Sequence, residues 1–331
     1  MKKAFSLILT AILASCMLTG CGGSSDSGSG AFNTGNTAAV ITGNTTNSSS
    51  TAEGSSEEQI SVQQPQLNAD ELIAGQRVVK TVYCGESATC TMYENYVVIV
   101  EGTGKISQPL KDASTVIVGE GITEIGYECF SGFKYLEQVQ LPSTLQKIGD
   151  KAFKDCTSLK SVWVPDGVNE IGEYAFHMCN SLTGVRLPET VTKMGNNIFF
   201  SCTRLETVNL PSNMTAVPDG TFMYCRKLRS VTIPSGVTEI GESAFGNCDS
   251  LTQIDLPLIL TTIDDNAFID DTGIKNITLP SSVEKVGKNA FSGWTASQTI
   301  TVERKSGRPT TWDPKWAGDY TNIGVNVVWN G

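Results

Sequence analysis

The sequence predicts an α/β solenoid made of 23-residue coils, with a parallel sheet on its concave side and short helical turns on its convex side. The first reason is a constant period. Segments that begin with leucine or isoleucine follow one another every 23 residues, at Leu136, Leu159, Leu182, Leu205, Leu228, Leu251 and Ile274. The second reason is that each segment repeats one order of apolar residues, proline and glycine, which is the signature of stacked repeats.

The strand of each coil is predicted by two apolar positions that stand two residues apart. Val139 and Leu141 therefore point to one side of a strand, and Gln140 points to the other. A proline follows the strand in all seven copies: Pro142, Pro165, Pro188, Pro211, Pro234, Pro257 and Pro280. Because proline has no N–H to donate to a ladder, we expect each strand to end there.

The second half of each coil is expected to form the convex side. The first copy reads Gly149, Asp150 and, after two residues, Phe153, the largest core side chain of its coil. A carboxylate or amide after the glycine favours the start of a helical turn. Four residues depart from the repeat and predict less regular coils: Pro218 and Asp264 replace the glycine, and Asp271 and Trp294 replace the closing cysteine.

A single coil buries too little to stand alone, and stacking lets each coil cover its neighbour, as in leucine-rich repeats. The pattern L-x-x-V-x-L-P-x-x-V-x-x-I-G-x-x-A-F-x-x-C resembles the BspA-like class of these repeats, found mostly on bacterial surface proteins. Residues 84–106 resemble the N-terminal cap that often precedes such arrays, and 307–331 resemble their C-terminal cap. The resemblance implies adhesion to host proteins or neighbouring cells.

The chain divides into five expected parts. They are a lipoprotein signal peptide at 1–20, a disordered acidic linker rich in Ser, Gly, Thr and Asn at 21–75, a β-rich N-terminal cap at 76–112, the leucine-rich repeat solenoid at 113–302 and a C-terminal cap at 303–331. The linker contains too few apolar side chains to offset the entropy of ordering, so we expect it to act as a tether.

The N-terminus resembles a bacterial lipoprotein signal. A basic start, MKK, precedes a short apolar run that ends in LTGC, which is similar to a lipobox. The resemblance implies cleavage before Cys21, acylation of Cys21 and attachment to a lipid bilayer, because two or more acyl chains hold a protein stably. A plain signal peptide with a chance cysteine is the alternative. Either way, we expect the protein outside the cytoplasm, at the cell membrane or cell surface.

Composition narrows the function classes. The net charge of −10 opposes nucleic-acid binding, and a single histidine excludes a histidine-dependent triad or a multi-histidine metal site within one chain. No outward column holds two carboxylates in neighbouring coils, and no phosphate-binding motif is present. We therefore expect neither an enzyme nor a bound metal or cofactor. We also expect a monomer.

Cysteines recur in one column of the solenoid, at Cys156, Cys179, Cys202, Cys225 and Cys248. Side chains of one column point the same way and stay too far apart to pair, so we expect buried free thiols. Cys84 and Cys90 lie six residues apart across a predicted hairpin, where a disulfide is favoured and two free thiols are the alternative. His177 occupies a variable position on the convex edge, where we expect it to be solvated.

The outward-facing column of the strands contains the candidate binding residues. It reads Gln140, Trp163, Arg186, Asn209, Thr232, Asp255 and Thr278. Trp163 is the one tryptophan predicted to face outward, and Arg186, one coil away, is close enough to stack on it. Lys160 flanks the same face. Leu258 and Ile259 stand where other copies have polar residues or glycine, and we favour local packing there over an apolar contact patch.

The sequence thus predicts a lipid-anchored cell-surface protein whose concave sheet binds a protein ligand. The main alternative is a glycan- or cell-wall-binding lipoprotein, in which Trp163 stacks on a sugar ring. A structural component of the envelope without a discrete ligand is the second alternative.

Overall fold

The computed structural model describes residues 67–305, 307–318 and 324–331, which all belong to one compact unit, Ser55–Gly331. The signal peptide, Cys21 and most of the predicted linker lie outside the described residues. Among the residues that are described, no helix is long and apolar enough to cross a membrane.

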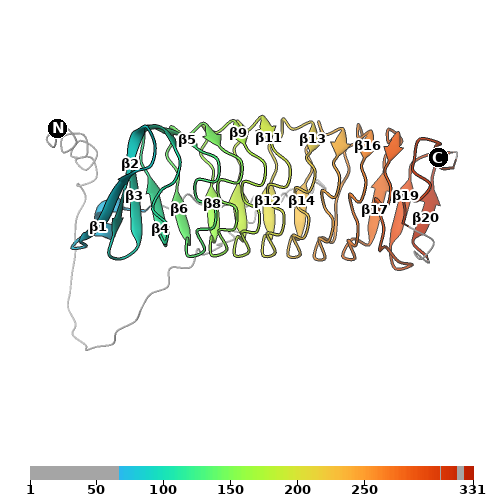
Figure 1. Ribbon diagram of the computed structural model, residues 1–331. Coiled ribbons are helices and arrows are strands. Elements are labelled where there is room, and N and C mark those ends of the chain that lie inside the picture. Colours follow the sequence, from blue (N-terminus) through green and yellow to red (C-terminus); the bar gives the residue numbers. More distant parts are fainter. Residues whose placement is uncertain (1–66, 306, 319–323) are drawn as a thin grey trace, which may run out of the picture. The chain divides into compact units, whose positions relative to one another are not determined.

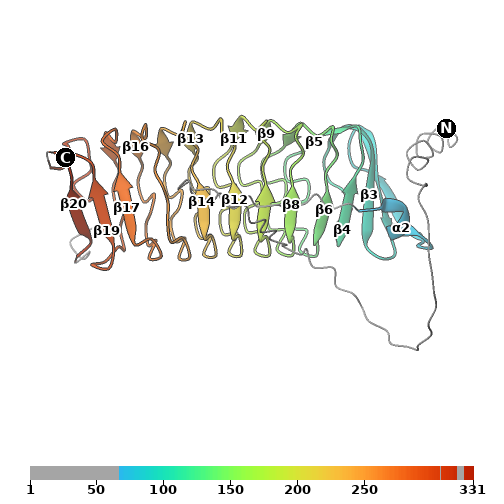
Figure 2. The ribbon, with the colours of Figure 1, turned by 180° about the vertical axis from the view of Figure 1, so that it is seen from behind.

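The described chain is a solenoid, which confirms the predicted fold class. Its strands form two rows that run along the stack of coils (Figures 1 and 2). The front row consists of β4 (Thr115–Val118), β6 (Gln138–Gln140), β8 (Ser161–Trp163), β10 (Gly184–Arg186), β12 (Thr207–Asn209), β14 (Ser230–Thr232), β17 (Asn276–Leu279), β19 (Thr299–Val302) and β20 (Asn326–Trp329). The second row consists of β5 (Ile122–Ile125), β7 (Lys147–Ile148), β9 (Glu170–Ile171), β11 (Lys193–Met194), β13 (Ala216–Val217), β15 (Glu239–Ile240), β16 (Thr262–Ile263) and β18 (Lys285–Val286).

An antiparallel sheet covers the N-terminal end of the stack. Strand β1 (Val78–Tyr83) pairs with β2 (Ser87–Tyr93), and β2 pairs with β3 (Val97–Ile106). Strand β3 is long enough to begin both rows, because its first half pairs with β4 and its second half with β5. The predicted hairpin at 84–90 therefore comprises the turn between β1 and β2 and the first residues of β2.

A short helix, α2 (Ala69–Ile73), lies inside the range expected to be linker. Its N-cap is Asn68, whose side chain accepts hydrogen bonds from the backbone N–H groups of Asp70 and Glu71. Asn95 Nδ2 also donates to the carbonyl of Leu72 at 2.7 Å. The cap and the bond from Asn95 order a segment whose composition alone predicts disorder.

The expected helical turns on the convex side are wrong, because α2 is the only helix among the described residues. Each convex segment is instead a series of tight turns, in which residues such as Lys151 and Asp155 have left-handed φ angles of 56° and 59°. These turns form hydrogen bonds with the next coil. The N–H groups of Lys151, Phe153 and Asp155 each donate a 2.8 Å hydrogen bond to a carbonyl 22 residues later. The bonds between coils offset the cost of left-handed backbone at non-glycine residues.

The acidic column after the glycine serves the same stacking, rather than capping helices. Asp150 Oδ1 accepts a 2.9 Å bond from the N–H of Glu173, and Asp219 Oδ1 accepts a 2.8 Å bond from the N–H of Glu242. Each of these two aspartates therefore holds the coil that follows it.

The core is organised in columns that run along the whole stack. Phenylalanine rings of successive coils stack with centroids 5.1–5.8 Å apart: Phe130, Phe153, Phe176, Phe199, Phe222, Phe245, Phe268 and Phe291. The cysteine column consists of buried free thiols, as predicted. Each thiol also donates to the carbonyl of the phenylalanine 26 residues before it, as Cys202 does to Phe176 over 3.1 Å.

Both rows of strands are interrupted near residues that depart from the repeat. In the second row, β11 and β13 do not pair, and at this coil Pro218 replaces the glycine whose N–H normally bonds to the preceding coil. Gly195 and Gly241, at the equivalent positions, donate 2.9 Å bonds of this kind. In the front row, the sixth coil forms no strand between β14 and β17, and β6 and β8 do not pair.

Candidate binding surface

The strand face, defined here as the outward side of the front row, brings Trp163 and Arg186 together as predicted. Strands β8 and β10 pair in parallel with Trp163 directly opposite Arg186. The guanidinium carbon of Arg186 lies 4.6 Å from the centroid of the Trp163 ring, which is the geometry of a cation–π contact. Both residues are half-buried, because each lies against the neighbouring coil.

Arg186 is held in this position by two further contacts. Its Nη1 donates to Asp166 Oδ1 at 2.5 Å and to the carbonyl of Val164 at 3.2 Å. Asp166 was not among the predicted residues, although its place just after Pro165, one coil before Arg186, is a signal that could have identified it. Trp163 and Arg186 thus form a fixed cation–aromatic unit, with the exposed carboxylate of Asp166 beside it.

Asn209 and Lys160 extend the strand face on either side of this unit. Asn209 Nδ2 donates to the carbonyl of Leu187 over 3.0 Å, which repeats one coil later the bond from Arg186 to Val164. Lys160 is exposed and forms an ion pair with Glu137, with Nζ and Oε2 2.5 Å apart. An exposed ion pair of this kind adds little stability, so Lys160 is available to a ligand at small cost.

Gln140 has a different role from the one expected. Its Oε1 accepts a 2.9 Å hydrogen bond from the N–H of Leu67, just before helix α2. The chain's own N-terminal segment therefore engages Gln140. The candidate surface accordingly begins at Trp163 and contains Trp163, Arg186, Lys160 and Asn209.

The solvated environment expected for His177 is wrong. Its ring stacks on Phe200 with centroids 5.1 Å apart and meets Tyr174 edge-on at 5.4 Å, while Tyr224 meets Phe200 at 5.5 Å. Partial burial lowers the pKa of His177, and its buried Nδ1 has no partner among the described residues. The variable convex positions of three coils thus form an aromatic cluster that single-position reasoning missed.

Cys84 and Cys90 lie close together at the end of the β1–β2 hairpin. Both are free, buried thiols in the structure, and Cys90 Sγ accepts a 3.2 Å bond from the N–H of Leu110. A hydrogen bond from the Cys84 thiol lowers the pKa of Cys90 to about 7, and the same bond together with burial raises the pKa of Cys84. The disulfide between them stays a prediction.

The prediction that Leu258 and Ile259 pack locally is wrong, since the structure leaves their side chains 79% and 49% exposed.

A pair of carboxylates on the second row was not predicted, because its members come from two different columns of the repeat. Burial, together with hydrogen bonding to Asp264, raises the pKa of Glu239, and Asp264 forms a 2.6 Å ion pair with Lys285. The pair lies on the second row, remote from the strand face.

Comparison with solved structures finds bacterial leucine-rich repeat proteins. Among solved structures, the chain is similar to a leucine-rich repeat protein of T. pallidum (27% identity, TM-score 0.42, 62% of this chain and 85% of that chain). It is also similar to one from Bacteroides ovatus (20%, 0.35, 77% and 99%) and to a leucine-rich cell surface protein of Faecalibacterium prausnitzii (18%, 0.33, 75% and 94%). No curated protein sequence matches it.

A match to a family model shows which protein family the chain belongs to. The model of the BspA type leucine-rich repeat region matches residues 110–229 and 215–307, with six copies of the repeat. These ranges overlap and together span more than half of the chain and nearly the whole stack of coils. The chain therefore belongs to the BspA-type leucine-rich repeat family.

Proposed function

We propose that this protein is a lipid-anchored cell-surface protein whose strand face binds a protein ligand, with a role in adhesion to host or neighbouring cells. The observation that carries the proposal is the Trp163–Arg186 stack. An aromatic ring and a guanidinium group held together on a rigid strand pair are the residue types that dominate binding energy in protein interfaces. No chemical reaction is proposed.

The geometry favours a protein over a sugar as the ligand. The Arg186 guanidinium covers one face of the Trp163 ring, so that face is closed to the stacking that a sugar ring requires. The rim of the unit offers Asp166, Lys160 and Asn209 for hydrogen bonds and ion pairs with a polar protein surface.

The test is a binding screen of the soluble chain 22–331 against purified extracellular-matrix proteins and a glycan array. We expect at least one protein ligand whose affinity falls about tenfold or more in both Trp163→Ala and Arg186→Ala, equivalent to about 1.4 kcal/mol. Tyr127→Ala is the matched control, because Tyr127 is an exposed ring with Lys151 Nζ 5.3 Å from its centroid, outside the strand face.

Two results would contradict the proposal and favour one of the alternative functions. Glycan hits that depend on Trp163 but not on Arg186 would support the glycan-binding alternative. Hits that all survive Trp163→Ala, or an absence of hits, would favour an envelope scaffold.

The proposed anchor is tested separately. The LTGC sequence ending at Cys21 supports acylation, and the cell-surface description of the F. prausnitzii protein supports the same location. Cells expressing the full chain should incorporate a clickable fatty acid into it, and Cys21→Ser should abolish the label and release the protein from the membrane fraction. Incorporation unchanged by Cys21→Ser would overturn the anchor.

A further inference from the structure

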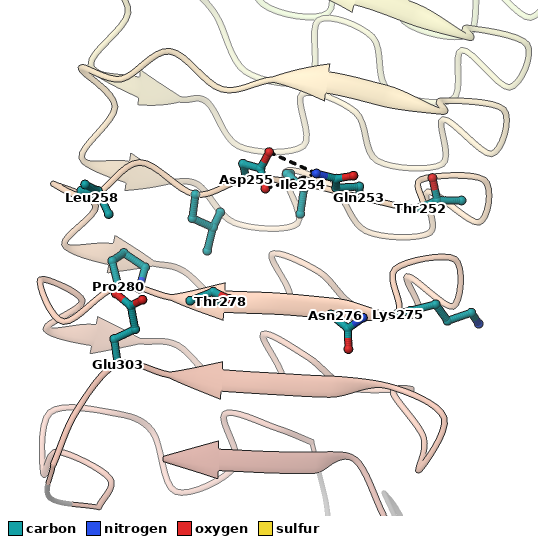
Figure 3. A pocket seen from close by; sticks show the side chains of 11 residues that line it. Thr252, Gln253, Ile254, Asp255, Leu258, Lys275, Asn276, Thr278, Pro280 and Glu303 are labelled. Carbon is teal, nitrogen blue, oxygen red and sulfur yellow. Dashed lines mark hydrogen bonds between the residues drawn. The ribbon is translucent and has the colours of Figure 1, made fainter. Parts of the chain in front are cut away.

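The sixth coil contains a second irregular site on the strand face, about four coils from Trp163, or roughly 19 Å at about 4.8 Å per coil. A pocket of about 430 Å³ opens between this coil and β17. The residues that line this groove are spread along it in Figure 3: Leu258, Pro280 and Glu303 lie at one end, Asp255 and Gln253 in the middle, and Lys275 and Thr252 at the other end.

The backbone of this coil is not part of the sheet. Within the described chain, no backbone hydrogen bond joins Thr252–Leu256 to either neighbouring coil. Strands β8, β10, β12 and β14 have these bonds, as from Thr183 to Lys160 and from Arg229 to Glu206, both 3.0 Å. Strands β6 and β8 do not pair either, but a 3.2 Å bond from Lys160 to Glu137 joins their coils. Strand β14 consequently pairs only with β12, and β17 only with β19. The N–H and C=O groups on both sides of the groove are open to water or to a ligand.

The apolar end of the groove is unique to this coil. In other coils the two residues after the strand proline are polar or glycine, whereas here they are Leu258 and Ile259. Leu258 is 79% exposed, the most exposed aliphatic side chain among the described residues. An exposed leucine beside open backbone groups matches the way in which exposed sheet edges bind extended peptides: the main chain supplies affinity and side-chain subsites supply specificity.

The charged residues of the groove indicate which side chains a bound peptide would carry. Asp255 has a side-chain hydrogen bond only from Gln253 Nε2, at 3.3 Å to its Oδ2, and it forms no ion pair within the described residues. Glu303, at the apolar end, also lacks an ion-pair partner in the described part of the chain. Most other strand-face charges do have partners, as Lys160 has in Glu137. Lys275, a cation that also lines the groove, lies at the end opposite Leu258 and Glu303. The two unpaired carboxylates, in the middle and at the apolar end, fit a cationic side chain next to an aliphatic one.

We infer that this groove binds an extended peptide segment of a protein, with an aliphatic side chain placed on Leu258 and Pro280 and a lysine or arginine paired with Asp255. Asp255 and Leu258 are three residues apart, about 10 Å along extended chain, so the two side chains of the peptide are two to four residues apart. The groove is independent of Trp163, and the inference stands or falls without the proposed function.

The test uses a random heptapeptide display library as the probe and the soluble chain 22–331 as the target. We expect enrichment of peptides that carry Lys or Arg two to four residues from Leu, Ile or Val. Binding of these peptides, remade synthetically, should weaken about tenfold in Leu258→Ser, which introduces the residue found at this place in the fifth and seventh coils. In Asp255→Asn the preference for a basic residue should disappear, while the aliphatic preference remains.

Two controls make the result decisive. Ser235→Ala changes the position equivalent to Leu258 one coil earlier and should leave binding unchanged, as should Trp163→Ala. Circular dichroism melting of each variant shows whether the solenoid is intact. Enrichment of acidic peptides, enrichment that survives Leu258→Ser, dependence on Trp163, or no enrichment would each overturn the inference.

Discussion

Asp271 Oδ1 accepts a 2.7 Å hydrogen bond from the backbone N–H of Cys248, inside the core between the fifth and sixth coils. Its Oδ2 is buried without a partner among the described residues. In the same column, Cys248 Sγ and Trp294 Nε1 donate to phenylalanine carbonyls 26 residues earlier. Burial raises the pKa of Asp271 well above its usual range, and the charges of Asp249 and Asp270 raise it further. A protonated Asp271 can donate to the Phe245 carbonyl, as its column neighbours do to theirs.

The first prediction is that Asp271 makes stability fall as pH rises. The pKa of Asp271 is raised in the folded state. Its contribution to the free energy of unfolding is therefore fully present below the pKa of the unfolded state, near 4, and is lost as the pH rises toward the folded-state pKa. Asp271→Asn keeps a neutral donor at every pH. We expect this variant to be more stable than the wild type by about 1–3 kcal/mol at pH 8 and by much less at pH 4. Urea unfolding at both pH values measures the difference, and a pH-independent difference would contradict the prediction.

The second prediction concerns the Trp163–Arg186 contact. In a double-mutant cycle on stability, Trp163→Leu and Arg186→Met should show a coupling energy of about 0.5–1 kcal/mol, the usual value for a partly exposed cation–π contact. Trp163→Leu combined with Arg229→Met is the control, because three coils separate these residues and their effects should add within about 0.5 kcal/mol. Equal coupling in both cycles would mean that the contact contributes nothing of its own.

The third prediction separates the two groups of cysteines. Burial raises the pKa of Cys179, Cys225 and Cys248, so these thiols should react with N-ethylmaleimide only after unfolding. Cys84 and Cys90 should form a disulfide in protein isolated from an oxidising compartment, seen as one cross-linked peptide by mass spectrometry without reduction. Recovery of both as alkylated thiols, after unfolding in the alkylating reagent, would rule out the disulfide.

The sequence was sufficient for the period, for the core columns and for the front-row strands other than that of the sixth coil, since each of these repeats along the chain. The second row of strands was not predicted. It also placed Trp163 opposite Arg186, because a constant period of 23 residues aligns equivalent residues of neighbouring strands. The convex side was assigned wrongly, as the Asp150 position suits both a helix N-cap and a bond to the next coil. The hydrogen bonds between coils decide between a helix N-cap and a bond to the next coil, and the sequence of a single coil does not show those bonds.

The remaining errors come from contacts that only the stacked structure defines. His177 was judged from its own coil, whereas the ring that stacks on it, Phe200, occupies the same repeat position one coil later. Gln140 is engaged by Leu67, from a segment whose composition gave no structural signal. The groove at the sixth coil depends on lost hydrogen bonds, although Leu258 and Ile259 already marked that coil as unusual.

The last prediction uses Pro218, where the second row of strands is interrupted. Pro218→Gly supplies the missing N–H, which can donate to the Met194 carbonyl as Gly241 donates to Val217 over 2.9 Å. The new bond should add about 0.5–1.5 kcal/mol, while the greater freedom of the unfolded chain costs about 0.4–1 kcal/mol, so the free energy of unfolding should change by less than about 1 kcal/mol. Hydrogen exchange is therefore the informative measurement. The amide introduced at position 218 should be protected like that of Gly241, and exchange as fast as in an exposed loop would show that another residue separates β11 from β13.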